Sequence, residues 1–188
     1  MNQSQEVLIR ISPTPNPYAW KFILDRPVLM QGKATFSTEA ECVGYPMAQD
    51  LLQLNGVTQV HFFSNVITIT HSPEVPFDTI SDLVNAVIHR DMVIHNPNIT
   101  IEDTKKKKRE GLSPEVRQIE EILDRTIRPG LQGDGGDIEI IKYEHPNLTV
   151  YYQGACGTCP SSTEGTLMAI EGILKDEFNP EIIVTPLN

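Results

Sequence analysis

The chain has 188 residues, of which 39% are hydrophobic and 21% charged, and its formal net charge is −10. This is the composition of a folded protein with one medium domain or two small ones, which excludes a disordered or fibrous chain. The negative charge argues against general nucleic-acid binding, and no apolar run approaches the roughly 20 residues of a membrane helix.

The first half of the chain alternates predicted strands with predicted helices. Three prolines at positions 13, 15 and 17 force an extended or turning segment after the first strand. Ser64-Asn65 separates two β-rich runs, which predicts a hairpin. Helical spacing predicts that the second helix buries Ile80, Leu83, Val84, Val87 and Ile88. The predicted strands are residues 7–11, 21–24, 57–63 and 66–70, and the predicted helices are residues 46–54 and 77–89.

A charged segment, residues 102–112, divides the chain. It holds the basic run 105–109 and has no apolar periodicity, so a solvated linker is favoured over a contact with nucleic acid or an anionic membrane. We therefore expect one domain in residues 1–101 and a second in residues 113–188. These two parts carry net charges of −4 and −8, and the linker carries +2.

The second domain has clear start and stop signals. Ser113 is a good helix N-cap before Pro114, and Pro129-Gly130 is expected to end that helix. A hairpin and a second helix, with Ser161 and Glu164 in the spacing of a capping box, come next. The predicted strands are residues 137–143, 148–153 and 182–185. The whole chain is thus expected to be α+β, and this domain to be ordered helix-strand-strand-helix-strand.

Cys156 and Cys159 form a C-x-x-C pair between a predicted strand and a predicted helix start. Unpaired amides and the helix dipole favour thiolate there, and Gly157 relaxes the turn between the sulfurs. An iron–sulfur cluster or a structural zinc usually takes four such ligands, and a two-fold dimer would supply them. No histidine is expected to add a ligand nearby, because His145 lies across the hairpin turn and the others, including His61, lie in the first domain without metal-ligand spacing. From the residues alone, metal or cluster binding and dithiol redox chemistry stay equally open, and a purely structural pair is a minor alternative.

Two linked motifs stand out in the second domain. They are Leu131-Gln132-Gly133-Asp134-Gly135-Gly136-Asp137-Ile138-Glu139 and Gly154-Ala155-Cys156-Gly157-Thr158-Cys159-Pro160-Ser161-Ser162 with Thr166-Leu167. With these motifs, residues 113–186 resemble the carboxyl-terminal domain of NifU, found in Nfu-type iron–sulfur carriers. Through Thr14-Pro15-Asn16-Pro17, Lys21-Phe22, and Gly56-Val57 with 66–70, residues 13–90 more loosely resemble the domain that often precedes it, although Tyr45-Pro46-Met47-Ala48 only approximates the family's small-residue turn.

The resemblance implies a carrier rather than an enzyme. In such a carrier, Cys156 and Cys159 would be the ligands of an iron–sulfur cluster shared between two protomers, with [4Fe–4S] favoured over [2Fe–2S]. The expected partners are a second copy of the chain, apo iron–sulfur proteins and upstream assembly proteins, with no nucleic acid and no membrane. The rival functions are a thiol–disulfide oxidoreductase and a module held together by zinc.

Three further expectations concern single features. Asp134-Gly135-Gly136-Asp137 is interpreted as a tight turn whose aspartates bond turn amides, with a direct role near the cluster as the weaker alternative. Cys42 is expected to be a small residue, buried or partly exposed, with no second cysteine at a useful spacing. Residues 1–17 show neither a secretion signal nor an Arg-rich presequence, so a cytoplasmic location is expected.

Overall fold

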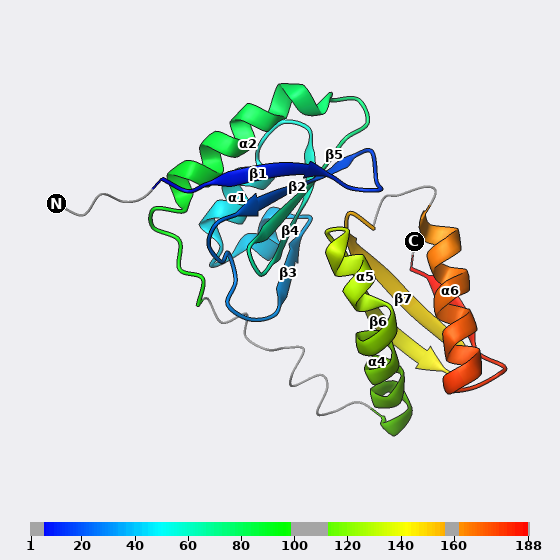
Figure 1. The fold of residues 1–188 in the computed structure, drawn as a ribbon. Coiled ribbons are helices and arrows are strands. Elements are labelled where there is room, and N and C mark those ends of the chain that lie inside the picture. The colour runs from blue at the N-terminus through cyan, green and yellow to red at the C-terminus, as the bar shows by residue number, and fades with distance from the viewer. Residues whose placement is uncertain (1–5, 99–112, 157–161, 188) are drawn as a thin grey trace.

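The computed structural model describes residues 6–98, 113–156 and 162–187. It contains two α+β domains, each with its own sheet and its own hydrophobic core (Figure 1). The predicted linker, Gly157, Cys159 and the start at Ser161 of the last predicted helix lie outside the described residues. Within the described part of the chain, every helix is too short or too polar to cross a lipid bilayer.

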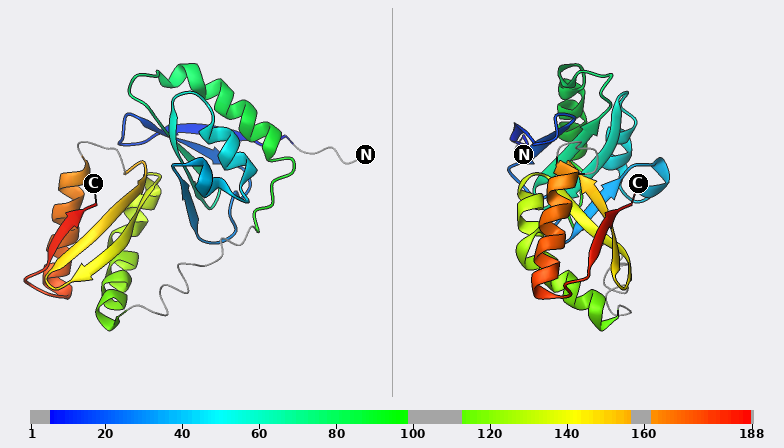
Figure 2. Two further views of the ribbon diagram at one scale, coloured as in Figure 1. Left: turned by 180° about the vertical axis from the view of Figure 1, so that it is seen from behind. Right: turned by 90° about the vertical axis from the view of Figure 1, so that its right-hand side faces the viewer.

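The first domain is a five-stranded antiparallel sheet with two α-helices on one face (Figures 1 and 2). Its strand order is β1-β2-β5-β4-β3. Large apolar side chains of the strands and of both helices are buried between the layers, among them Phe22, Phe62, Ile67, Ile80 and Val84. The elements are β1 Ile9–Pro13, β2 Ala19–Leu24, β3 Lys33–Phe36, the 3-10 helix η1 Glu39–Cys42, α1 Pro46–Leu52, β4 Val57–Phe63, β5 Val66–His71 and α2 Phe77–Asp91.

Most predicted elements of this domain are confirmed, with shifted ends. The hairpin of β4 and β5 turns at Ser64, whose φ of 53° is the left-handed conformation that such a turn needs. The first strand begins two residues later than predicted, and β3 and η1 were not predicted. Leu83 is 51% exposed, so its predicted burial is wrong: it lies at the edge of the apolar stripe of α2.

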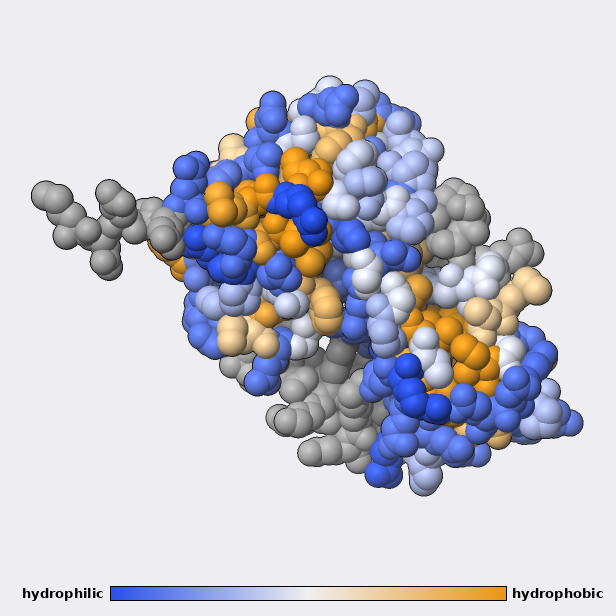
Figure 3. Space-filling view, viewed as in Figure 1, coloured by the Kyte–Doolittle hydropathy of each residue, from blue (hydrophilic) through white to orange (hydrophobic). Residues whose placement is uncertain are grey.

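The second domain packs α4 and α6 against one face of a three-stranded sheet of order β6-β7-β8 (Figures 1 and 2). Strand β7 pairs antiparallel with β6 and parallel with β8. Figure 3 shows hydrophobic surface between the α4–α5 pair and α6, the outer rim of this core. The elements are α4 Pro114–Thr126, α5 Arg128–Gly133, β6 Gly136–Glu144, β7 Asn147–Gly154, α6 Ser162–Glu177 and β8 Ile183–Pro186.

The predicted order of this domain is confirmed, with one additional helix. Ser113 caps α4, since its hydroxyl accepts a hydrogen bond from the Val116 amide at 3.3 Å. Pro129 does not end the helical region as predicted. It stands in the first turn of the short helix α5, where its missing N–H costs nothing. Helix α5 brings the chain back to the start of β6, beside the end of β7.

Candidate metal centre at the end of strand β7

Cys156 lies two residues beyond the end of β7, in a turn held against β6. Gly136 and Gly154 face each other in the β6–β7 register, and the Ala155 amide donates to the Gly135 carbonyl at 3.1 Å. Gly154 has a φ of 62°, which lets the chain leave the strand sharply. The Cys156 side chain is only 7% exposed and packs in the core of the second domain. The position of its sulfur is therefore fixed by packing.

Gly136 leaves the space that the Cys156 thiol occupies. A Cβ atom built on Gly136 would lie 2.2 Å from the Cys156 sulfur and 2.9 Å from its amide nitrogen. Gly135 has a φ of 82°, which confirms the turn predicted for this motif. In addition, the second glycine of the motif leaves room for the thiol, whereas a direct role of the motif near the cluster stays a prediction.

Asp137 is the centre of a buried ion cluster. Its carboxylate pairs with Lys33 of the first domain, lies 3.6 Å from Arg128 Nε, and accepts from Gln132 Nε2 at 3.1 Å and from the Ile138 amide. Burial opposes ionisation of Asp137, but the charge and hydrogen bond of Lys33 hold the pKa of this carboxyl below its usual range. The prediction that the aspartates hydrogen-bond to turn amides is therefore incomplete, because Asp137 mainly forms ion pairs with Lys33 and Arg128.

Arg128 extends this cluster within the second domain. It pairs with Glu120 at 2.6 Å and with Asp124, and it donates to the Ile138 carbonyl. Burial disfavours the charged guanidinium, but Glu120 and Asp124 more than offset this and raise its pKa. Asp137 is thus held by a cation from its own domain as well as by Lys33.

The first domain contacts the turn that carries Cys156. Asn16 Nδ2 donates to the Ala155 carbonyl at 2.8 Å, and Lys21 Nζ donates to the Gly133 carbonyl at 2.6 Å. His61 lies beside Gly154, since a Cβ on that glycine would be 3.2 Å from His61 Cγ. The sequence places His61 in the other domain, and the structure brings it beside the end of β7. A contact between residues so distant in the chain leaves no local sequence signal.

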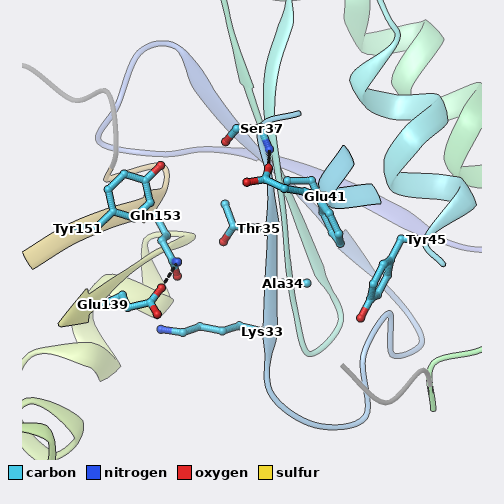
Figure 4. Close-up of a pocket in the computed structure, with 10 residues that line it drawn as sticks. Lys33, Ala34, Thr35, Ser37, Glu41, Tyr45, Glu139, Tyr151 and Gln153 are labelled. Carbon is cyan, nitrogen blue, oxygen red and sulfur yellow. Dashed lines mark hydrogen bonds between the residues drawn. The ribbon is translucent and has the colours of Figure 1, made fainter. Parts of the chain in front are cut away.

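A polar cavity of about 350 Å³ lies beside these contacts, between β3 with η1 on one side and β6 with β7 on the other (Figure 4). Gln153 donates to Glu139 at 2.9 Å, and Glu41 accepts from the Ser37 and Thr38 amides. The carboxylates of Glu139 and Glu41 are therefore engaged in hydrogen bonds within the protein. The lining residues are Lys33, Ala34, Thr35, Phe36, Ser37, Glu41, Tyr45, Glu139, Tyr151 and Gln153.

Of the two other cysteines, the structure describes only Cys42. Cys159, the second expected ligand, lies outside the described residues. Cys42 is 2% exposed at the end of η1, as expected, and its thiol lies 3.5 Å from the Thr38 carbonyl. Burial and the nearby Glu41 and Glu39 raise the pKa of this thiol, which disfavours the thiolate that a metal would need. In the described ranges, no three His, Cys, Asp or Glu side chains converge as a metal site would require.

Tyr152 is an additional residue near the thiol that sequence reasoning did not single out. It is 6% exposed, and its hydroxyl has no hydrogen-bond partner within the described part of the chain. Burial, and secondarily the charge of Cys156, raise the pKa of Tyr152, so it stays a neutral phenol.

Both domains match known families in sequence. Residues 9–95 match "Scaffold protein Nfu/NifU N terminal", and residues 119–185 match "NifU-like domain". The chain is 31% identical over 180 residues to NifU-like protein 4, mitochondrial, of Arabidopsis thaliana, covering 92% of this chain and 63% of that protein. It is 32% identical over 178 residues to NFU1 iron-sulfur cluster scaffold homolog, mitochondrial, of Homo sapiens, covering 94% and 70%. A Drosophila ananassae protein of the same description is 32% identical over 186 residues, covering 97% and 64%.

These relatives correct one expectation and identify the family. They are named mitochondrial, which contradicts the predicted cytoplasmic location. That prediction rested on the residue pattern of positions 1–17 alone. The chain spans 63% of the length of the Arabidopsis relative and 64% of that of the Drosophila one. Matches over both domains, together with 32% identity to a relative of which the chain covers 70%, show that it belongs to the Nfu family of NifU-like proteins.

Proposed function

We propose that this chain is an iron–sulfur cluster carrier and not an enzyme. Cys156 and Cys159 of two protomers hold the cluster as cargo, and the loaded dimer passes it to apo iron–sulfur proteins. The observation that carries the proposal is the position of the Cys156 thiol. It occupies the space that Gly136 leaves, within the residues that match the NifU-like domain. Relatives that are named iron-sulfur cluster scaffold homologs support the same cargo.

The proposed dimer follows from the number of thiolates. A [4Fe–4S] or [2Fe–2S] cluster held by cysteine takes four of them, and the C-x-x-C pair supplies two per chain. Cys42 cannot complete the set, because it is buried in the core of the first domain with a raised pKa. Two copies of the pair are the simplest complete ligand set. We favour [4Fe–4S], as the resemblance implies.

The proposed test is the metal and sulfide content of anaerobically prepared full-length protein, with its mass in solution. We expect iron and acid-labile sulfide in near-equal amounts on a dimer, and the iron count per dimer then identifies the cluster. A metal-free monomer that stays so after reconstitution would favour dithiol redox chemistry at the same pair. Zinc without sulfide would favour a structural module.

The domains are proposed to divide the work. We assign cluster binding to residues 113–188, selection of partners to residues 1–101, and the tether to residues 102–112. A fragment of residues 113–188 is expected to take up iron and sulfide in the same ratio per chain as the full chain, because its core contains Cys156. A folded fragment, checked by circular dichroism, that binds no cluster would contradict this division.

A further inference from the structure

The first domain covers the turn of Cys156 with the sheet face that carries no helices. Side chains alternate along a strand, so the core residues Phe22 and Ile67 point to the helices and their neighbours point away. Lys21 pairs with Thr68 in the sheet register, and Thr68 pairs with His61, which forms a polar row across that opposite face. Thr68 and His61 are each 1% exposed. A polar face of a sheet is normally solvated, so its burial marks it as a docking surface.

The two surfaces approach at glycine backbone. A Cβ on Gly135 would lie 2.8 Å from both Lys21 Cγ and Thr68 Oγ1, and one on Gly154 would lie 3.2 Å from His61 Cγ. Each glycine thus faces the polar row directly. An approach this close requires a defined arrangement of the two domains, since a side chain at either position would separate them.

Polar bonds fix the same arrangement at three points. Asn16 lies in the Thr14-Pro15-Asn16-Pro17 segment between β1 and β2, is 1% exposed, and donates to the Ala155 carbonyl next to Cys156. The ammonium of Lys33 reaches the fully buried Asp137, and Lys21 reaches the Gly133 carbonyl. These three bonds and the close approaches at Gly135 and Gly154 together form the docking contact.

The docking contact bears directly on the cysteine. It engages residues 133–137 and 154–155, the two segments that pack around Cys156, and that side chain is 7% exposed. A cluster shared by two chains requires the second copy to bring its own thiolates within bonding distance of the same few iron atoms. The first domain lies against both of these segments.

We propose that the first domain is a reversible cap on the Cys156 turn. While docked, it shields the thiol and excludes a second copy, and it undocks when the cluster-bridged dimer forms. This inference rests on the proposed carrier function. It gives the Thr14-Pro15-Asn16-Pro17 motif a role, which is to close the binding turn of its own chain.

Two substitutions weaken the docking contact from the side of the first domain. Asn16→Asp keeps the oxygen that accepts from the Tyr18 amide at 3.0 Å but replaces the donor to Ala155 with a carboxylate oxygen. Lys33→Met removes the ammonium, while Arg128 and Gln132 still hold Asp137. The matched controls are Asn96→Asp, an exposed residue that accepts from the Asn98 amide in the same way, and Lys142→Met, whose ammonium pairs with the exposed Glu144.

The experiment measures the alkylation rate of Cys156 in reduced, metal-free, full-length protein, assigned by fragment mass spectra with Cys42 as the internal reference. We expect Asn16→Asp to raise that rate about fivefold, the ratio given by the typical net worth of one hydrogen bond. Lys33→Met is expected to raise it further, and the two controls to leave it unchanged. In parallel, both variants are expected to form cluster-bearing dimer faster than the unmodified chain.

An unchanged Cys156 rate in both variants would overturn the cap. Equal acceleration of Cys42 would also overturn it, because it would show general loosening of the protein instead of undocking. The alkylation assay needs no cluster, so it is independent of the carrier proposal. An unmodified chain that takes up no iron and sulfide would refute the carrier function while the alkylation rates still decide whether the domain shields the thiol.

Discussion

Cys156→Ser is expected to lower the iron and sulfide retained by the reconstituted full-length chain by more than about tenfold. Loss of a group that only hydrogen-bonds to a metal ligand already costs about 10–100-fold in metal affinity, and here the ligand itself is lost. A serine hydroxyl stays protonated at neutral pH and offers a hard oxygen in place of the thiolate that cluster iron prefers. The substitution keeps the shape of the side chain, so the turn is expected to stay folded. Iron and sulfide analysis beside a thermal melt separates loss of cargo from loss of fold.

The matched control for this substitution is Cys42→Ser. Cys42 is also a buried thiol, 2% exposed, and the change of atoms is the same, but it lies in the core of the first domain. Burying a hydroxyl there costs about 1 kcal/mol of stability and should leave cluster content unchanged. Equal iron and sulfide in the two variants would refute the ligand assignment for Cys156. Cys159→Ser is expected to match Cys156→Ser.

Gly136→Ala is expected to distort the site although it replaces neither proposed ligand. The new methyl group would lie 2.2 Å from the Cys156 sulfur and 2.9 Å from the Cys156 amide nitrogen, so either β6 or the cysteine turn must move. Overpacking of this kind costs about 1–3 kcal/mol, which lowers the melting temperature of a small domain by on the order of 10 °C. The cluster content is expected to fall with it, because the thiol is displaced from its packed position.

Gly130→Ala is the control for that change. Gly130 lies in α5 outside the docking contact, and a Cβ there would have no neighbour within 4 Å. Its melting temperature and iron content should equal those of the unmodified chain. A Gly136→Ala protein that melts and binds iron like the control would show that the space beside Cys156 is not needed.

The parts of the fold that could be predicted are those with a strong local signal. The hairpin at Ser64-Asn65 and the cap at Ser113 depend on neighbours in sequence, and both are confirmed. Strand β3 was missed because it is a short edge strand stabilised by pairing with β4, which residues 33–36 do not reveal. Helix α5 was missed because Pro129 was interpreted as a stop, although proline equally suits the start of a new helix.

The candidate site was only partly predictable, because many of the residues around it are remote from the cysteines in sequence. A C-x-x-C pair is visible in the chain, and Cys156 is indeed placed at the end of a strand. The surroundings of the thiol come from elsewhere: Gly136 from the neighbouring strand, and Asn16 and His61 from the other domain. A buried charge such as Asp137 also reveals its partners only in three dimensions, since Lys33 is remote in sequence.

The packing of Cys156 among the apolar side chains of its domain has a thermodynamic consequence. Ile138, Tyr152 and Val150 belong to the same core, so the free energy that folds the domain also positions the sulfur. A zinc finger differs, because there the metal supplies the folding energy and its removal unfolds the chain. In the proposed carrier, folding would therefore not depend on the cargo. After each delivery the protein would remain a folded acceptor that is ready for another cluster.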